Sequence, residues 1–382
     1  MKASFRLGRI AGVEVGVHYT WLVAFALITW TLADGFFPST YRGWAQATYW
    51  ITGAISAILL FGSVLVHELA HSLVARRRGL PVQGITLFIF GGVSSIAGEA
   101  KTARDEFVIA VVGPVTSLVL AALFWAAWVL LFQGKDPLSA IVAYLALINA
   151  MLGVFNLLPG FPLDGGRVLR AAIWGATRSL SKATRVAATV GQLMAFGFIG
   201  WGVFQLLQGN VLGGLWIAFI GWFLNGAADS ARRETAVQDA LRGITVREVM
   251  DSNPETAATE TSVDALVREC FLQRGRRALP VQEDGRLVGI VTLTDVKGVP
   301  PERWPATRVA EIMTRGPLYA VAPSDDVAEA LKLLAEHGLN QVPVTTEGRV
   351  VGLLSRADVI RYLHFLAELG LSSAARLRGG KA

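Results

Sequence analysis

Charged residues and cysteines are both scarce in this sequence of 382 residues. Lys, Arg, Asp and Glu together make up 17% of the chain, whereas 53% of its residues are hydrophobic. With a mean hydropathy of +0.48, the chain is too apolar for a soluble enzyme of this size. Its single cysteine, Cys270, excludes an intrachain disulfide and indicates a reducing environment.

Two further classes are excluded by what surrounds the apolar runs. No cleavable signal peptide is expected, because the first apolar run starts late and lacks a clear small-residue cleavage site. The net charge is +6, but a nucleic-acid partner is not expected. Much of the basic excess flanks apolar runs, where Lys and Arg set the topology of a membrane protein. The 40 glycines and 11 tryptophans suit helices that pack closely in lipid and anchor at its surfaces.

Six apolar segments are predicted to cross the membrane. They are residues 18–33, 49–75, 107–132, 138–158, 187–207 and 211–228. If these spans alternate in direction, one side carries Lys2, Arg6, Arg9, Arg76, Arg77, Arg78, Lys101, Arg104, Arg167, Arg170, Arg178, Lys182, Arg185, Arg232 and Arg233. The other side carries only Asp34, Arg42, Lys135 and Asp136. The positive-inside rule therefore predicts a multi-pass protein of the plasma membrane with both termini in the cytoplasm.

Two segments on the predicted cytoplasmic side read as strands. Residues 9–17 alternate in polarity and predict one short strand. Residues 82–96 predict a hairpin, with strands over 82–90 and 93–96 and a turn at Gly91 and Gly92. This hairpin either offers an edge strand to an unwound peptide or only plugs the cytoplasmic mouth of the protein.

His67, Glu68 and His71 form an H-E-x-x-H motif near the end of the second apolar segment. On a helix, two imidazoles four residues apart lie on one face and can reach one metal ion. Glu68 lies beside them, outside the ligand set, where a general base would act. No residue between 43 and 66 is charged. Ionisable side chains in such surroundings are costly unless they pair or bind something, which strengthens the metal interpretation.

A second polar cluster, residues 156–167, follows the fourth apolar segment. Pro159 and Pro162 cannot lie comfortably inside a helix, so regular structure is expected to end there. This break belongs to the same predicted cytoplasmic end as the histidines, so Asp164 can meet them. Two histidines and one carboxylate leave a fourth tetrahedral position open, which is typical of a catalytic zinc site.

The last third of the chain is less apolar and repeats itself. Residues 279–281 match residues 342–344, and residues 285–296 match residues 348–359. Each unit reads as strand, helix, strand, turn, strand, helix. Two tandem units of about 60 residues predict one pseudo-symmetric soluble module.

At this point the chain resembles the site-2 protease family of intramembrane zinc metalloproteases, in the subgroup with C-terminal CBS domains. The metal motif and the segment N-x-x-P-x-x-P-x-D-G are similar to the family's two signatures. The resemblance implies one Zn²⁺ per chain, bound by His67, His71 and Asp164. It implies that Glu68 is the general base and acid, and that Asn156 helps to hold the scissile carbonyl or its oxyanion. The implied substrates are membrane proteins, cut within or next to transmembrane segments.

The implied fold is an α-helical polytopic membrane protein, with six transmembrane helices and a small membrane-associated β-hairpin or sheet, followed by an α/β tandem CBS module. Gly113 and Pro114 match the third helix of the family. Many members have Asn three residues after that proline, whereas this chain has Ser117, to which no role is assigned.

The repeated module resembles a CBS pair. In such pairs a Ser or Thr before the last helix of each unit, and an Asp three residues later, can bond the ribose of an adenine nucleotide. Here these are Thr292 with Asp295, and Ser355 with Asp358. ATP, ADP or AMP is the implied ligand; the alternative is that the four residues only cap the helices that follow. Because CBS pairs often associate face to face, a homodimer through this module is also expected.

The predicted organisation is a membrane metalloprotease domain over 1–228, a linker over 229–243, CBS domains over 244–302 and 303–366, and a tail over 367–382. Expected partners are a transmembrane protein substrate, membrane lipid and an adenine nucleotide.

The main alternative is a CBS-regulated metal-ion channel or transporter, because ionisable residues inside a membrane also mark ion routes. A pore would require neither Glu68 directly after the first histidine nor Asn156 eight residues before the carboxylate, so the protease is preferred. A non-catalytic scaffold is disfavoured because every expected ligand and base is present.

Overall fold

The computed structural model describes residues 4–89, 91–96 and 98–369, so most of the predicted tail over 367–382 lies outside the described residues. The chain divides into two units, Met1–Thr235 and Ala236–Ala382. The boundary falls inside helix α8 (Val211–Leu241), so the predicted linker is helical up to Leu241.

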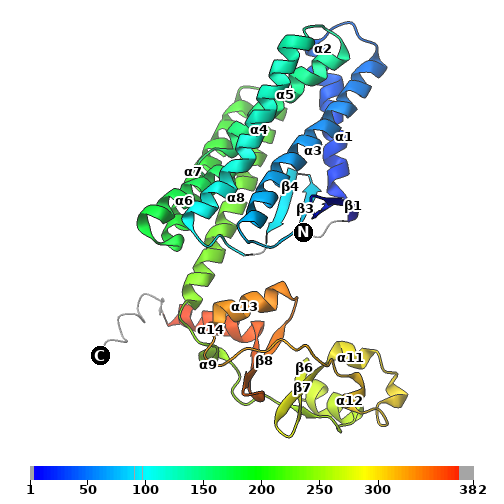
Figure 1. Cartoon of the computed structure of the whole chain (residues 1–382), viewed down its shortest axis with the longest axis vertical. Helices are drawn as coiled ribbons and strands as arrows, with labels where there is room; N and C mark the ends of the chain where they lie inside the picture. The colour runs from blue at the N-terminus through cyan, green and yellow to red at the C-terminus, as the bar shows by residue number, and fades with distance from the viewer. Residues whose placement is uncertain (1–3, 90, 97, 370–382) are drawn as a thin grey trace. The chain divides into compact units, whose positions relative to one another are not determined.

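The first unit is built from long helices that run side by side (Figure 1). The helical segments before α8, long and short, are α1 (Thr20–Trp30), the π-helical segment η1 (Thr31–Phe36), α2 (Phe37–Thr40), α3 (Gln46–Arg77), α4 (Ala103–Leu131), α5 (Pro137–Asn156), α6 (Asp164–Thr177) and α7 (Leu180–Leu207). The short helix α6 was not predicted, because the charges between residues 167 and 185 read as a connection between spans.

Five helical segments of the described chain are long and apolar enough to cross a membrane. They are Thr20–Thr40, Gln46–Arg77, Ala103–Leu131, Pro137–Asn156 and Leu180–Leu207. They coincide with five of the six predicted spans, although the first continues through η1 and α2 to Thr40. The sixth predicted span, residues 211–228, lies within α8 and is not among them, so it stays a prediction.

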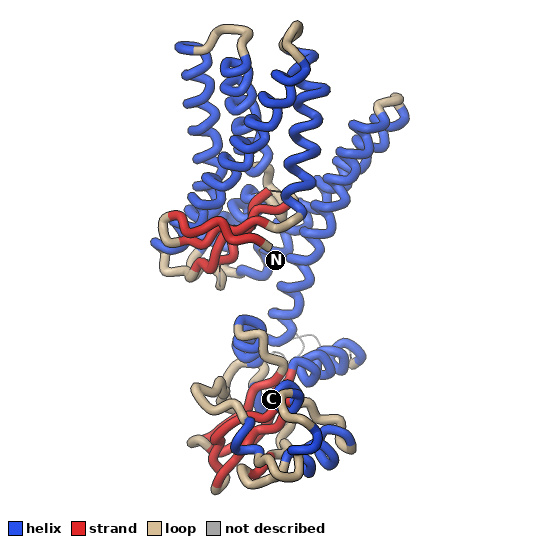
Figure 2. The backbone as a smooth tube through the Cα atoms, turned by 90° about the vertical axis from the view of Figure 1, so that its right-hand side faces the viewer, coloured by secondary structure: helices blue, strands red, loops and turns tan. Residues whose placement is uncertain are grey.

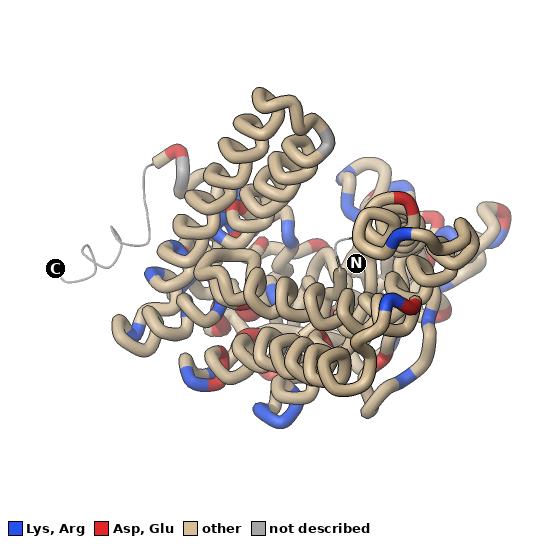
Figure 3. The backbone as a smooth tube through the Cα atoms, turned by 90° about the horizontal axis from the view of Figure 1, so that it is seen from above, with Lys and Arg blue, Asp and Glu red and all other residues tan. Residues whose placement is uncertain are grey.

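The outer faces of these helices are apolar. Large side chains such as Leu123, Leu130 and Leu193 are 61%, 78% and 67% exposed. Few charged residues lie on the long helices, whose tubes are mostly tan in Figure 3. So many exposed large apolar side chains on these helices indicate a protein surrounded by lipid rather than water.

A four-stranded sheet lies at one end of the helices (Figure 2). Its order is β1 (Phe5–Ile10), β2 (Val13–Val17), β3 (Val82–Phe88) and β4 (Gly91–Ile96). Only the pair β2–β3 is parallel. The prediction of one strand over 9–17 was wrong, because residues 5–17 form a hairpin. Its turn residues Ala11 and Gly12 have φ values of 49° and 77°, as a two-residue hairpin turn requires, and an alanine there gives little warning of it.

The hairpin predicted over 82–96 is confirmed, but its turn was misplaced. Gly91 and Gly92 belong to β4, where they pair with Phe88 and Leu87, so the connection comes earlier. Phe90, predicted to end the first strand, lies outside the described residues. Gly92 is needed for packing rather than for a turn: a Cβ there would lie 2.5 Å from Cγ of Glu68.

The second unit contains a five-stranded sheet in the order β5-β6-β7-β9-β8. The strands are β5 (Ala257–Ala258), β6 (Ala278–Glu283), β7 (Arg286–Thr292), β8 (Gln341–Thr346) and β9 (Arg349–Ser355). The helices are α9 (Val246–Val249), α10 (Val263–Ala265), η2 (Leu266–Leu272), α11 (Leu293–Lys297), η3 (Pro301–Arg303), α12 (Val309–Ile312), α13 (Val327–Glu336) and α14 (Arg356–Glu368).

The predicted repeat is visible in the registers of this sheet. Leu279 pairs with Val291 in the first hairpin, and the equivalent residues Val342 and Leu354 pair in the second. Each hairpin packs on its own hydrophobic core. The first strand of the second repeat is reduced to one bridge between Val321 and Val344.

Candidate metal centre

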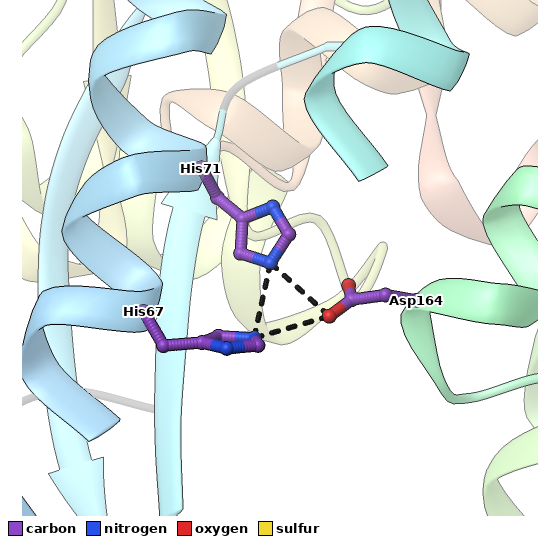
Figure 4. Close-up of side chains that lie close together, drawn as sticks. All are labelled: His67, His71 and Asp164. Carbon is purple, nitrogen blue, oxygen red and sulfur yellow. Dashed lines mark hydrogen bonds and ion pairs between the residues drawn. The ribbon is translucent and has the colours of Figure 1, made fainter. Parts of the chain in front are cut away.

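Three side chains from two helices converge at the end of the helices where the sheet lies. His67 and His71, on α3, are 4% and 3% exposed, and Asp164 is the first residue of α6. Oδ2 of Asp164 lies 3.1 Å from Nε2 of each histidine, and the two Nε2 atoms are 3.2 Å apart (Figure 4). One ligand atom from each residue therefore faces a common point.

The other ring nitrogens of both histidines are held by α4. Nδ1 of His71 lies 2.6 Å from the carbonyl oxygen of Ile109. Because a carbonyl can only accept, this Nδ1 carries a proton, and the neutral ring presents the lone pair of Nε2 to the site. Nδ1 of His67 lies 2.8 Å from Oγ of Ser117, which fixes the orientation of that ring.

Helix α4 also leaves the space that the imidazoles need. A Cβ at Gly113 would lie 2.7 Å from Nε2 of His67 and would overlap Nε2 of His71. Pro114 follows directly, and both residues are buried in α4. Any side chain at Gly113 would therefore occupy the centre of the site.

The loop that leads to Asp164 is held against α7 through Phe161. Helix α5 ends at Asn156, and the N–H of Phe161 donates to the carbonyl of Ala187 at 3.2 Å. A Cβ at Gly191 of α7 would overlap the carbonyl oxygen of Phe161, so backbone meets backbone there. The loop has little freedom, and the residue three positions later is Asp164.

Glu68 is not part of the converging set and is contacted by the sheet instead. Ser94 of β4 donates from Oγ to Oε2 of Glu68 at 2.7 Å, and Ser72 donates to Oγ of Ser94 at 3.2 Å. Strand β4 therefore lies beside the motif, and the two alternatives for the hairpin, strand pairing and plugging, both stay predictions.

The residues fit a zinc ion. Two imidazole nitrogens and one carboxylate oxygen, all within 4.8 Å of one another, form a donor set that zinc accepts. At least one of the nitrogens presents a lone pair toward a carboxylate oxygen, and such crowding of electron pairs favours a cation between them.

Both parts of the chain match known protein families. The model of Peptidase family M50 matches residues 55–135 and 132–198, and the model of the CBS domain matches residues 246–301 and 309–365. Rip3 of Mycobacterium tuberculosis, named as a zinc metalloprotease, is 38% identical over 370 residues, which cover 95% of this chain and 93% of the relative. The chain belongs to the site-2 protease family.

Two other members of this family extend the comparison. The protein sll0528 of Synechocystis, also named as a zinc metalloprotease, is 33% identical over 371 residues, covering 95% of this chain and 96% of the relative. The solved structure of a site-2 protease from Methanocaldococcus jannaschii is 28% identical and covers 60% of this chain and 95% of that chain, with a TM-score of 0.42. The family models and the two curated relatives show that the present chain is a site-2 type metalloprotease with a CBS pair.

The structure does not bring Asn156 into contact with the three converging residues. Its Nδ2 donates to the carbonyl of Leu152, one turn earlier in α5, at 3.0 Å. The role in holding the scissile carbonyl, implied by the family resemblance, therefore stays a prediction for this residue.

The four predicted nucleotide-binding residues form two helix caps. Oδ2 of Asp295 accepts from N and Oγ1 of Thr292, both at 2.7 Å, and Oγ1 of Thr292 accepts from the N–H of Asp295 at 3.3 Å. Ser355 and Asp358 repeat this pattern at 3.0, 2.5 and 3.2 Å. The capping alternative thus describes their contacts within the chain, and the nucleotide role stays a prediction.

The contacts of two residues beside the site were not predicted from the sequence. Ser117, to which no role was assigned, contacts His67, and Ser94 contacts Glu68. A signal existed for the first, because Gly113 and Ser117 are four residues apart and so lie on one face of α4. Ser94 belongs to a strand, and no spacing along the chain relates it to α3.

Proposed function

We propose that this protein is an intramembrane zinc endopeptidase that hydrolyses peptide bonds within or next to the transmembrane segments of membrane protein substrates. The observation that carries this proposal is the convergence of His67, His71 and Asp164 beside Glu68. In the proposed site these three residues bind one zinc ion per chain. Zinc bound there supplies Lewis-acid chemistry, lowering the pKa of water and polarising a carbonyl.

Glu68 moves the proton in this proposal. Its Oε2 accepts a hydrogen bond from Ser94, so Oε1 is the oxygen that takes a proton from the attacking water. The same carboxyl group then gives a proton to the leaving amide nitrogen. Asn156 supplies an amide donor to the developing oxyanion, which requires its side chain to turn away from the carbonyl of Leu152.

We further propose that α8 supplies a sixth span over residues 211–228, and that both termini and the CBS domains face the cytoplasm at the plasma membrane. The excess of Lys and Arg on one side of the spans supports this orientation. The proposed membrane domain covers 1–228, and the linker 229–243 joins it to the CBS domains over 244–302 and 303–366.

Metal content and cleavage together test the proposed function. We expect purified full-length protein to contain about one zinc ion per chain by elemental analysis, and to cleave a model single-pass protein in proteoliposomes. Removal of zinc with a chelator should stop cleavage, and added zinc should restore it. His71→Ala should lose both zinc and cleavage, because only two of the three donors remain.

Two results would contradict the protease. One is cleavage that persists after zinc has been removed. The other is zinc-dependent ion flux through the same proteoliposomes without any peptide product, which would favour the channel or transporter.

We also propose that ATP, ADP or AMP binds the CBS module and changes protease activity, and that this module forms a homodimer. The paired caps at Thr292–Asp295 and Ser355–Asp358 support this, since each presents a carboxylate at an equivalent place in its repeat. A nucleotide present at 100 times its Kd should stabilise the module by about 2.7 kcal/mol.

This stabilisation is measured as a rise in Tm of the purified protein with each nucleotide. GTP serves as the control for base recognition, and the cleavage rate is recorded in the same samples. If the adenine nucleotides change neither Tm nor rate, the nucleotide proposal is wrong, and the four residues act as caps only.

A further inference from the structure

An ion pair with a buried carboxylate connects α4 to α6. Glu106 of α4 is 1% exposed, and the side chain of Arg170 of α6 is 14% exposed. Nε of Arg170 donates to Oε1 of Glu106 at 2.7 Å, and Nη2 of the same guanidinium also contacts this oxygen. Arg167, one turn earlier in α6, brings its Nε to 3.9 Å from that oxygen. Burying two charges contributes little net stability, so the pair calls for another explanation.

Both helices in this pair carry parts of the metal site. Glu106 precedes Ile109, Gly113 and Ser117 on α4 by three, seven and eleven residues, so all four lie on one face of the helix. Ile109 and Ser117 contact the two imidazoles, and Gly113 makes room for them. Arg170 follows Asp164 by six residues on α6. The ion pair therefore connects the helix that orients the histidines to the helix that begins with the carboxylate.

Arg170 also contacts the loop on the other side of Asp164. Its guanidinium lies over the ring of Phe161, with Cζ 5.3 Å from the ring centroid. The N–H of Phe161 is bonded to α7 through the carbonyl of Ala187. One side chain thus holds the loop three residues before Asp164, the helix after it and, through Glu106, the helix behind the histidines.

We propose that Glu106 and Arg170 are positioning residues for the metal site. Their ion pair sets the start of α6 so that Oδ2 of Asp164 lies 3.1 Å from both Nε2 atoms. Neither residue touches the proposed ion. This inference rests on the proposed zinc site and adds to it the pair that holds its third ligand in place.

The experiment measures zinc affinity by competition with a chromophoric chelator, using full-length protein in detergent. Glu106→Gln and Arg170→Gln are each expected to raise the Kd for zinc about tenfold or more, as is typical when a residue that orients a ligand is lost. Arg170→Lys keeps the charge but cannot serve Glu106 and Phe161 at once, so an intermediate effect is expected. It carries the test if the other variants do not fold. The absorption of bound Co²⁺ should shift in the same variants, because it reports the ligand geometry.

The Asp164→Ala background separates positioning from general stability. If the ion pair acts through Asp164, then Glu106→Gln should change the remaining zinc affinity by less than about twofold once Asp164 is gone. Asp105→Asn provides the matched control. Asp105 is the neighbour of Glu106 on α4 and pairs with Arg78 of α3 at 2.5 Å, but it has no contact with α6 among the described ion pairs. This variant should bind zinc like the wild type.

Two results would overturn the inference. One is wild-type zinc affinity in folded Glu106→Gln and Arg170→Gln proteins. The other is an equal loss of affinity with and without Asp164. A wild-type protein that binds no zinc would overturn the proposed function itself, so the two failures can be told apart.

Discussion

Glu68→Gln should abolish peptide cleavage while leaving about one zinc ion bound to each chain. The amide has the same shape as the carboxylate and can still accept the hydrogen bond from Ser94, which now reaches Oε2 at 2.7 Å. It cannot take a proton from water, however. A positioned general base contributes about 10²- to 10⁴-fold to a rate, so the turnover number should fall by at least about a hundredfold. Zinc should stay, because Glu68 is outside the set of converging ligand atoms.

The measurement is the initial rate of cleavage of a model single-pass substrate, with zinc content determined in the same preparation. Glu14→Gln makes the same chemical change on β2, where the half-exposed Glu14 pairs with Arg9, and it should cleave like the wild type. Cleavage by Glu68→Gln within about tenfold of the wild type would reject Glu68 as the general base. A channel or transporter predicts no peptide product from either protein.

The contribution of α3 to the site could be predicted because it follows from helix geometry alone. Residues four apart share a face, so the motif already places His67 and His71 side by side. The approach of Asp164 needed one more step, the inference that Pro159 and Pro162 end a helix on the same side of the membrane as the motif. The repeat in the second unit could also be predicted, because residues 279–281 match residues 342–344 in sequence. In the structure the equivalent residues Leu279 and Val342 take equivalent places in the sheet.

The features that escaped prediction depend on contacts between elements distant in sequence. Ser94 reaches Glu68 from a strand, and Ser117 reaches His67 from another helix. The spacing of four residues from Gly113 marks the face of α4 on which Ser117 lies, but no spacing along the chain relates Ser117 to His67 or Ser94 to Glu68. Gly92 was interpreted as a turn residue, whereas the structure uses it where β4 passes close to Glu68. Arginines after Asp164 were interpreted only as topology signals, although Arg170 forms an ion pair with the buried Glu106. In each case the contact joins elements that are distant in sequence, so the partner could not be inferred from the local pattern.

Gly113→Ala should remove zinc from the site without changing any ligand. The added methyl group would lie 2.7 Å from Nε2 of His67 and overlap Nε2 of His71. These are the two atoms that face the converging point, and His71 cannot move away without losing the bond from its Nδ1 to the carbonyl of Ile109. We therefore expect zinc affinity to fall at least about tenfold, with a parallel loss of cleavage. At an ordinary helical glycine the same change would instead stabilise the helix, because alanine is the better helix former by about 1 kcal/mol.

Gly62→Ala is the matched control for this change. Gly62 lies in α3, five residues before His67, and a Cβ there would meet nothing within 4 Å apart from its chain neighbours and the backbone of its own helix. This variant should bind zinc and cleave substrate like the wild type, with equal or slightly higher Tm. Zinc affinity and Tm are measured for both variants in the same detergent. If Gly113→Ala binds zinc as tightly as Gly62→Ala, the imidazoles of His67 and His71 do not lie against Gly113 of α4, and this description of the site is wrong.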